Sequence, residues 1–149
     1  MGKNKYEKFG ERNFGITTGT VGNSEGDIIW IGDTEVTAGK VYYLTEGEEG
    51  GDEWALADAD AELTSKNLLA VARGTGVAST VGMLVRGVVT LADDPGTGVG
   101  LPMFLSVTAG TLNRTAPTAA GDVVRVAGYQ LVDGGKVFFN PDATYILLA

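Results

Sequence analysis

Short apolar runs alternate with turn residues along almost the whole sequence. Each run is rich in Val, Ile, Leu and aromatic residues, and nearly every gap between runs holds Gly, Pro or Asp. This pattern is typical of short β-strands bounded by turns. It predicts strands at 27–32, 40–45, 54–57, 68–74, 81–91, 101–107, 122–131, 136–140 and 144–149.

Two segments carry more specific local signals. The stretch "VDGGKV" (132–137) places Asp133, Gly134 and Gly135 between two apolar runs, and these residues tolerate the positive φ of a tight hairpin. Residues 58–66 are rich in Ala and Glu, so one or two helical turns compete there with irregular structure. No strongly amphipathic helix is predicted between the strands.

Many short strands without intervening helices indicate antiparallel pairing in an all-β fold. We expect a compact antiparallel β-sandwich or β-barrel (27–149) that follows an extended N-terminal arm (1–26). An internal echo, in which "TAGKVYYLT" (37–45) resembles "GVGLPMFLS" (98–106), has two interpretations. Either the domain holds two related β units, about 27–91 and 92–149, or the echo is a chance similarity between turn-strand phrases.

Composition narrows the functional classes. The 149-residue chain has the length of one domain, and its net charge of -8 disfavours binding to nucleic acid. It contains no cysteine and no histidine, which removes disulfides, thiolate metal sites and the commonest general base. No apolar run reaches the length of a membrane span, and no signal-peptide pattern opens the chain, so we expect no membrane partner.

Several loops resemble ligand sites, but a structural interpretation accounts for each. The glycine-rich stretches "GTGVAS" (74–79) and "PGTGVG" (95–100) lack the Lys and Ser or Thr of a phosphate loop, and we expect no helix after them. The carboxylates of "DADAE" (58–62) lack the Gly and the final acid of a calcium loop. The acidic loop at 46–53 could hold a cation weakly, with a solvated loop tip as the simpler interpretation.

Catalytic and sugar-binding patterns are weaker still. Asp93 and Asp94 directly precede Pro95 and resemble a turn rather than the paired acids of a glycosidase. The aromatic residues Trp30, Tyr42, Tyr43 and Trp54 could form a sugar-stacking surface, although such residues in strands usually fill a core or a subunit interface. We therefore expect a protein that is not an enzyme, with no cofactor and no metal site.

The N-terminal arm differs from the rest of the chain in charge. Its first 13 residues have a positive balance, and aromatic residues lie between the charges. Such a segment could dock on a neighbouring protein, although fraying in solution is the commoner fate of a terminus. The candidate partner-binding residues of the arm are Tyr6, Lys8, Phe9, Arg12 and Phe14.

The second half of the chain resembles a known β module. The phrases that carry the resemblance are Gly87-Val88-Val89, "LPMFLS" (101–106), "TAGTL" (108–112), Thr115-Ala116-Pro117, the strand 121–129 and Phe138-Phe139-Asn140-Pro141. Together with "VTAGKVYYL" and "EWALADADA" upstream, they resemble a module of virion structural proteins from tailed bacteriophages, especially marine and cyanobacterial ones. The likeness spans roughly residues 27–148 and consists of turn and strand phrases, with no catalytic residue to carry over.

The resemblance implies a structural role in a virion. In such proteins the module occurs in capsid decoration (cement) proteins and in fibres, and it implies trimers or other symmetric assemblies. A single domain with a short arm and no long stalk favours a decoration protein, made in the host cytoplasm, on the capsid exterior. The partners would be the major capsid protein and further copies of the chain. A glycan-binding fibre or adhesin tip is the alternative.

The last strand completes this interpretation. Tyr145, Ile146, Leu147 and Leu148 form an apolar end that would be aggregation-prone if it stayed free. We expect these residues to be buried either within the domain or at a contact between subunits. They are the candidate residues of an oligomer interface.

Overall fold

The structure, a computed structural model, describes residues 20–132 and 134–149 and is built almost entirely from antiparallel β-strands. The strands are β1 (Ser24–Ile29), β2 (Glu35–Val36), β3 (Val41–Glu46), β4 (Asp52–Leu56), β5 (Leu69–Ala72), β6 (Gly76–Val77), β7 (Met83–Thr90), β8 (Pro102–Leu105), β9 (Leu112–Asn113), β10 (Val123–Val124), β11 (Val126–Val132), β12 (Lys136–Phe139) and β13 (Ile146–Leu147). The two short helical elements are the 3₁₀ turn η2 (Glu62–Thr64) and the helix α1 (Ala78–Val81). The expected all-β antiparallel class is confirmed.

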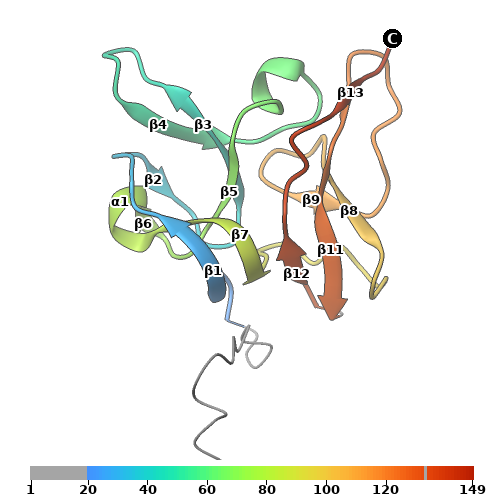
Figure 1. Ribbon diagram of the computed structural model, residues 1–149, viewed down its shortest axis with the longest axis horizontal. Coiled ribbons are helices and arrows are strands. Elements are labelled where there is room, and N and C mark those ends of the chain that lie inside the picture. Colours follow the sequence, from blue (N-terminus) through green and yellow to red (C-terminus); the bar gives the residue numbers. More distant parts are fainter. Residues whose placement is uncertain (1–19, 133) are drawn as a thin grey trace, which may run out of the picture.

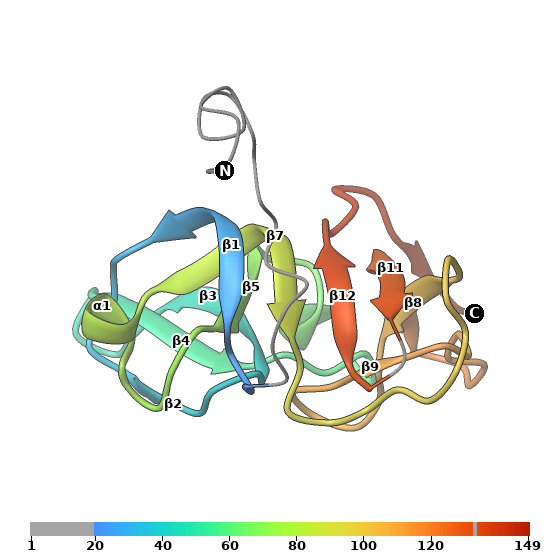
Figure 2. The same cartoon turned by 90° about the horizontal axis from the view of Figure 1, so that it is seen from below.

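One large sheet organises the molecule. Its strands follow the order β4-β3-β5-β7-β12-β11-β8-β9, and β1 pairs with β7 off this path. The sheet curls into a half-barrel, with β7 between the two halves (Figures 1 and 2). Two small sheets, β2-β6 and β10-β13, complete the fold.

The strand pairing of the first half is repeated in the second. We call β1, β3, β4, β5 and β7 the first unit, and β7, β8, β9, β11 and β12 the second, so that β7 belongs to both. In each unit the strands pair in the same order, and the registers match at the pairs given next, while β-bulges interrupt the two units at different places. The equivalent residue pairs are Leu44–Trp54 and Leu105–Leu112, Val41–Val71 and Pro102–Tyr129, and Val71–Leu84 and Tyr129–Phe138.

Backbone hydrogen bonds at the start of β3 and β8 repeat in the same way. The N–H of Gly39 donates to the carbonyl of Ala72, whose own N–H donates to the carbonyl of Lys40. In the second unit Gly100, Gln130 and Leu101 make the same two bonds. Gly39 and Gly100 both have a positive φ, which favours glycine at each strand start. These repeated contacts coincide with the echo in the sequence, and the division into two related units near residue 91 stays a prediction.

Two hydrophobic cores lie on opposite faces of the first unit. The central core lies between the units and combines residues of both: Val41, Ala57, Ala59, Leu69, Val71, Leu84, Val89, Leu91, Met103, Leu105, Leu112, Ala127, Val137 and Phe139. The second core lies on the other face of the first unit and contains Val36, Tyr42, Trp54, Ala70, Ala72, Ala78 and Met83. The segment around β2, together with α1, covers this second face (Figure 1).

Most predicted strands are present, with three differences in detail. β1 begins at Ser24 because its ladder with β7 extends to the pair Ser24–Val89, and it ends at Ile29 rather than at Gly32. The strand expected at 122–131 is divided into β10 and β11 at Arg125. The helical turn considered for 58–66 is one 3₁₀ turn, η2.

The hairpin expected at 132–137 is confirmed. β11 and β12 pair antiparallel, with Val132 opposite Lys136. Gly134 and Gly135 both have positive φ values, which fits the turn chemistry. Four elements were not predicted from the sequence: β2, β6, β9 and α1. Each is two to four residues long, which is too short to give a periodic pattern of apolar residues.

Candidate partner-binding surface

The last strand, β13, forms an open edge of the fold. It pairs only with β10 among the described residues, with Leu147 opposite Val123 and Ile146 opposite Val124. The N–H of Leu148 donates to the carbonyl of Asp122, so the backbone groups of Leu147 point away from β10. The other side of β10 is occupied, because the N–H of Val123 donates to the carbonyl of Ala59. β13 therefore offers one unpaired edge.

The side chains of β13 are apolar and exposed. Ile146 is 62% exposed and Leu147 is 49% exposed, on opposite faces of the strand. The expectation that 145–148 is buried within the domain is wrong for these two residues, because β13 pairs with β10 outside the main sheet and no described segment covers it. Tyr145 and Leu148 are half-buried. Their alternative role, a contact between subunits, stays a prediction.

A buried arginine holds β10 and the segment before β13 in place. Arg125 is 5% exposed, and its guanidinium donates to three backbone carbonyls: Nε to Asp142, and one terminal nitrogen to Ser65 and Asn67, each at 2.7 Å. Burial lowers the pKa of Arg125 from its ordinary value, whereas the nearby Asp142 raises it. Ser65 and Asn67 lie in the loop after η2, whereas Asp142 precedes β13. Arg125 therefore ties this loop to the C-terminal segment.

Polar contacts also fix the turn that leads into β13. Oδ1 of Asp142 accepts hydrogen bonds from the N–H and the hydroxyl of Thr144, each at 3.0 Å, and these bonds lower the pKa of Asp142. The hydroxyl of Tyr145 donates to Oε1 of Glu62 at 2.7 Å, and this bond raises the pKa of Tyr145. Leu63, which is also strongly exposed, follows Glu62 in η2. The exposed apolar strand β13 therefore follows a turn that hydrogen bonds hold in one conformation.

The arm residues proposed to bind a partner are Tyr6, Lys8, Phe9, Arg12 and Phe14, and they lie outside the described residues. The structure therefore assigns them no position. Their role stays a prediction from the sequence.

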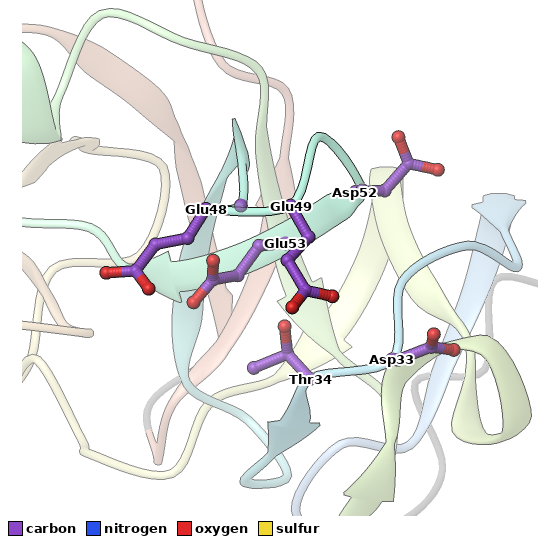
Figure 3. Close-up of a pocket in the computed structure, with 8 residues that line it drawn as sticks. Asp33, Thr34, Glu48, Glu49, Asp52 and Glu53 are labelled. Carbon is purple, nitrogen blue, oxygen red and sulfur yellow. The ribbon is translucent and has the colours of Figure 1, made fainter.

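The acidic loop contributes to a surface depression. β3 and β4 extend into the expected loop, leaving Gly47–Gly51 between them. The depression has a volume of about 600 Å³ and is lined by Asp33, Thr34, Gly47, Glu48, Glu49, Gly51, Asp52 and Glu53. Its carboxylates do not converge: Glu49 points towards Thr34, whereas Asp52 and Asp33 point away (Figure 3). Over residues 20–132 and 134–149, no three acidic side chains are placed to hold a metal ion.

The glycine-rich stretch 74–79 does not present a phosphate cradle. It leads into the short helix α1, which corrects our expectation that no helix follows it. The N–H groups of Ala78 and Ser79 donate to the carbonyls of Thr34 and Gly32. These amides are used within the chain and fasten α1 onto the segment around β2.

The remaining carboxylate pairs have structural partners. Asp58 accepts a hydrogen bond from the N–H of Asp60, and burial raises its pKa. Asp93 forms a 2.6 Å ion pair with Lys40, and Asp94 accepts a hydrogen bond from the N–H of Gly96. These contacts are typical of turns.

The four aromatic candidates do not share a surface. Trp54 and Tyr42 are buried in the second core, where the indole N–H donates to the carbonyl of Ile31. Tyr43 is partly buried and packs on the central core. Only Trp30 of this group is strongly exposed, with the guanidinium of Arg73 5.3 Å from its ring centroid. A sugar-stacking platform built from all four is therefore excluded.

Sequence reasoning did not single out Arg125, although it holds the C-terminal segment in place. Its position inside the apolar run "DVVRVAG" was the available signal, because a charge within a predicted buried strand needs buried partners.

Comparisons with known proteins found no relative of this chain. No family model matches the chain, and no curated protein or solved structure matches it. In the part of the chain that the structure describes, no helix has the length and apolar character needed to cross a bilayer.

Proposed function

We propose that this protein is a bacteriophage capsid decoration (cement) protein that binds the outer surface of the head and bridges major capsid protein subunits. The likeness of residues 27–148 to virion β modules supports this role, and so does the all-β fold. The protein would act as a homo-oligomer, with the trimer that the resemblance implies as its expected state. Several weak contacts per oligomer would then add up to stable attachment.

The observation that carries the proposal is the open apolar edge of β13. A soluble monomer gains nothing from an unpaired strand with Ile146 and Leu147 exposed, because such an edge invites aggregation. A partner strand could add to this edge through main-chain hydrogen bonds while its side chains cover the two apolar residues. The contacts of Arg125 fix the edge in advance, which lowers the entropic cost of binding.

A fibre or adhesin tip that binds glycan is less well supported. That role needs exposed aromatic rings beside polar groups in a groove. Trp54 and Tyr42 are buried. Trp30 and Tyr129 are strongly exposed, but neither lines the depressions formed by residues 33–53 and 106–122.

The test is a pull-down on purified capsids that lack this protein. We expect the full chain to bind in a fixed ratio to the capsid subunits, and Ile146→Asp to weaken binding at least tenfold. Val99→Asp is the matched control, because Val99 is also 62% exposed but lies in the loop before β8, at the other end of the second unit (Figure 1). Equal weakening by both variants, or no binding by the full chain, would refute the assignment of β13.

The same assay tests the arm. Deleting residues 1–13 should weaken capsid binding if the arm residues Tyr6, Lys8, Phe9 and Arg12 are anchors. Unchanged binding after this deletion would remove the arm from the interface while leaving the role of β13 intact.

A further inference from the structure

Equivalent sheet faces of the two units differ in burial. In the first unit, the face that carries Val41, Val71 and Leu84 is buried in the central core. The equivalent residues of the second unit are Pro102, Tyr129 and Phe138, which follow from the matching registers. Tyr129 is 46% exposed, and Pro102 and Phe138 are partly exposed.

This arrangement is a head-to-tail stack of two units. The opposite face of the first unit forms the second core with Tyr42, Trp54 and Met83. Their equivalents in the second unit, Met103, Leu112 and Val137, instead lie in the central core. One face of the first unit therefore packs on the other face of the second unit, and the second unit is left with its outer face uncovered by the described chain.

The outer face of the second unit is a continuous apolar surface. Pro102, Tyr129 and Phe138 are direct cross-strand neighbours on β8, β11 and β12. Phe104 and Val126 pair beside them. Arg86 lies at the border of this surface, with the guanidinium 5.6 Å from the ring centroid of Phe138. We call Pro102, Phe104, Val126, Tyr129 and Phe138 the outer aromatic face.

We propose that a second copy of this chain covers the outer aromatic face. Within one chain, the equivalent face of the first unit is already buried, because it packs against the second unit. The first unit cannot extend the stack head to tail, because α1 and the segment around β2 already cover its free face. We therefore expect the outer aromatic faces of two copies to pack on each other, as two sheets do in a sandwich. This contact has two-fold symmetry and predicts a dimer, which differs from the trimer that the resemblance implies.

Charge is compatible with this contact. All five residues of the face are uncharged. Arg86 at its border lies over the ring of Phe138 and forms an ion pair with Asp27, 3.9 Å away. By contrast, the other large open feature of this region, the outer edge of β1, carries Glu25 and Asp27, and pairing two copies there would oppose like charges. The apolar face is thus the better self-association surface of the two.

The test measures the oligomeric state of the full chain by sedimentation velocity over a range of concentrations. We expect a concentration-dependent oligomer, and at least a tenfold rise in its dissociation constant for Tyr129→Asp. Leu68→Asp is the control, because Leu68 is an equally accessible apolar residue (47% exposed) between η2 and β5, outside the outer aromatic face and outside β13, and its change should leave self-association unchanged. Thermal unfolding of each variant checks that the fold is retained.

A labelling measurement covers the case in which Tyr129→Asp fails to fold. The chain has no cysteine, so Tyr129→Cys gives a single reactive thiol at the face. Its reaction with a maleimide should slow at high protein concentration, whereas Leu68→Cys, outside the face, should react equally fast at all concentrations.

A monomeric full chain, or an oligomer that survives Tyr129→Asp, would overturn the proposal. So would protection of Tyr129→Cys that does not depend on concentration, because another segment of the same chain would then cover the face. Capsid binding is tested separately through Ile146→Asp, so failure of the proposed function would leave this result unaffected.

Discussion

At the residue scale, Arg125 is the side chain on which the C-terminal segment depends most. Its guanidinium satisfies three carbonyls at 2.7 Å, and those carbonyls would lose their partner in Arg125→Met. We expect this variant to lose roughly 2–4 kcal/mol of the free energy of unfolding. Chemical denaturation measures the loss, with Arg114→Met, at an exposed arginine, as the control. Equal stability of the two variants would contradict this stabilising role of Arg125.

The paired glycines at the strand starts give a second prediction at this scale. Gly39 and Gly100 have φ values of +75° and +83°, so alanine at either position is strained by about 1–2 kcal/mol. A Cβ at Gly39 would also overlap the backbone nitrogen of Ala92, whereas Gly100 has open space. Gly39→Ala should therefore lower the thermal midpoint more than Gly100→Ala. The reverse order would contradict the geometry described for the two turns.

At the element scale, the turn before β13 should respond to pH. Hydrogen bonds from Thr144 lower the pKa of Asp142 below its ordinary value of 3.8. A lowered folded pKa stabilises the fold above the ordinary value, and that contribution is lost as the pH falls through the folded value. Asp142→Ala should flatten this acid-side decline in the pH dependence of unfolding. An unchanged decline would show that another carboxylate causes it.

The elements also show what the sequence could and could not predict. Strands such as β3 and β7 were predictable because their apolar runs are bounded by turn residues, and the β11–β12 hairpin because Gly134 and Gly135 mark it. The break at Arg125 was not predictable, because it depends on carbonyls more than 50 residues away. The exposure of Ile146 was not predictable either, because an apolar strand has the same sequence pattern whether its own domain or a partner covers it.

At the scale of the whole molecule, the fold is a stack of two units that share β7. The sequence echo falls on β3 and β8, which occupy equivalent places in the two units, and the origin of the echo as a repeat stays a prediction. The stack leaves two apolar surfaces without a cover from the described chain: the edge of β13 and the outer aromatic face. We assign the first to the capsid and the second to another copy of the chain. On these two proposals, the protein would assemble through one surface and attach to the capsid through the other.

The central claim is that this protein reinforces a phage head from outside. The most direct measurement compares the temperature at which DNA-filled capsids lacking the protein release their DNA, with and without added full-length chain. Our account predicts a higher release temperature with the chain, and no increase with Ile146→Asp. An unchanged release temperature, together with binding of the chain to host-cell envelopes, would contradict the decoration role and favour a fibre tip.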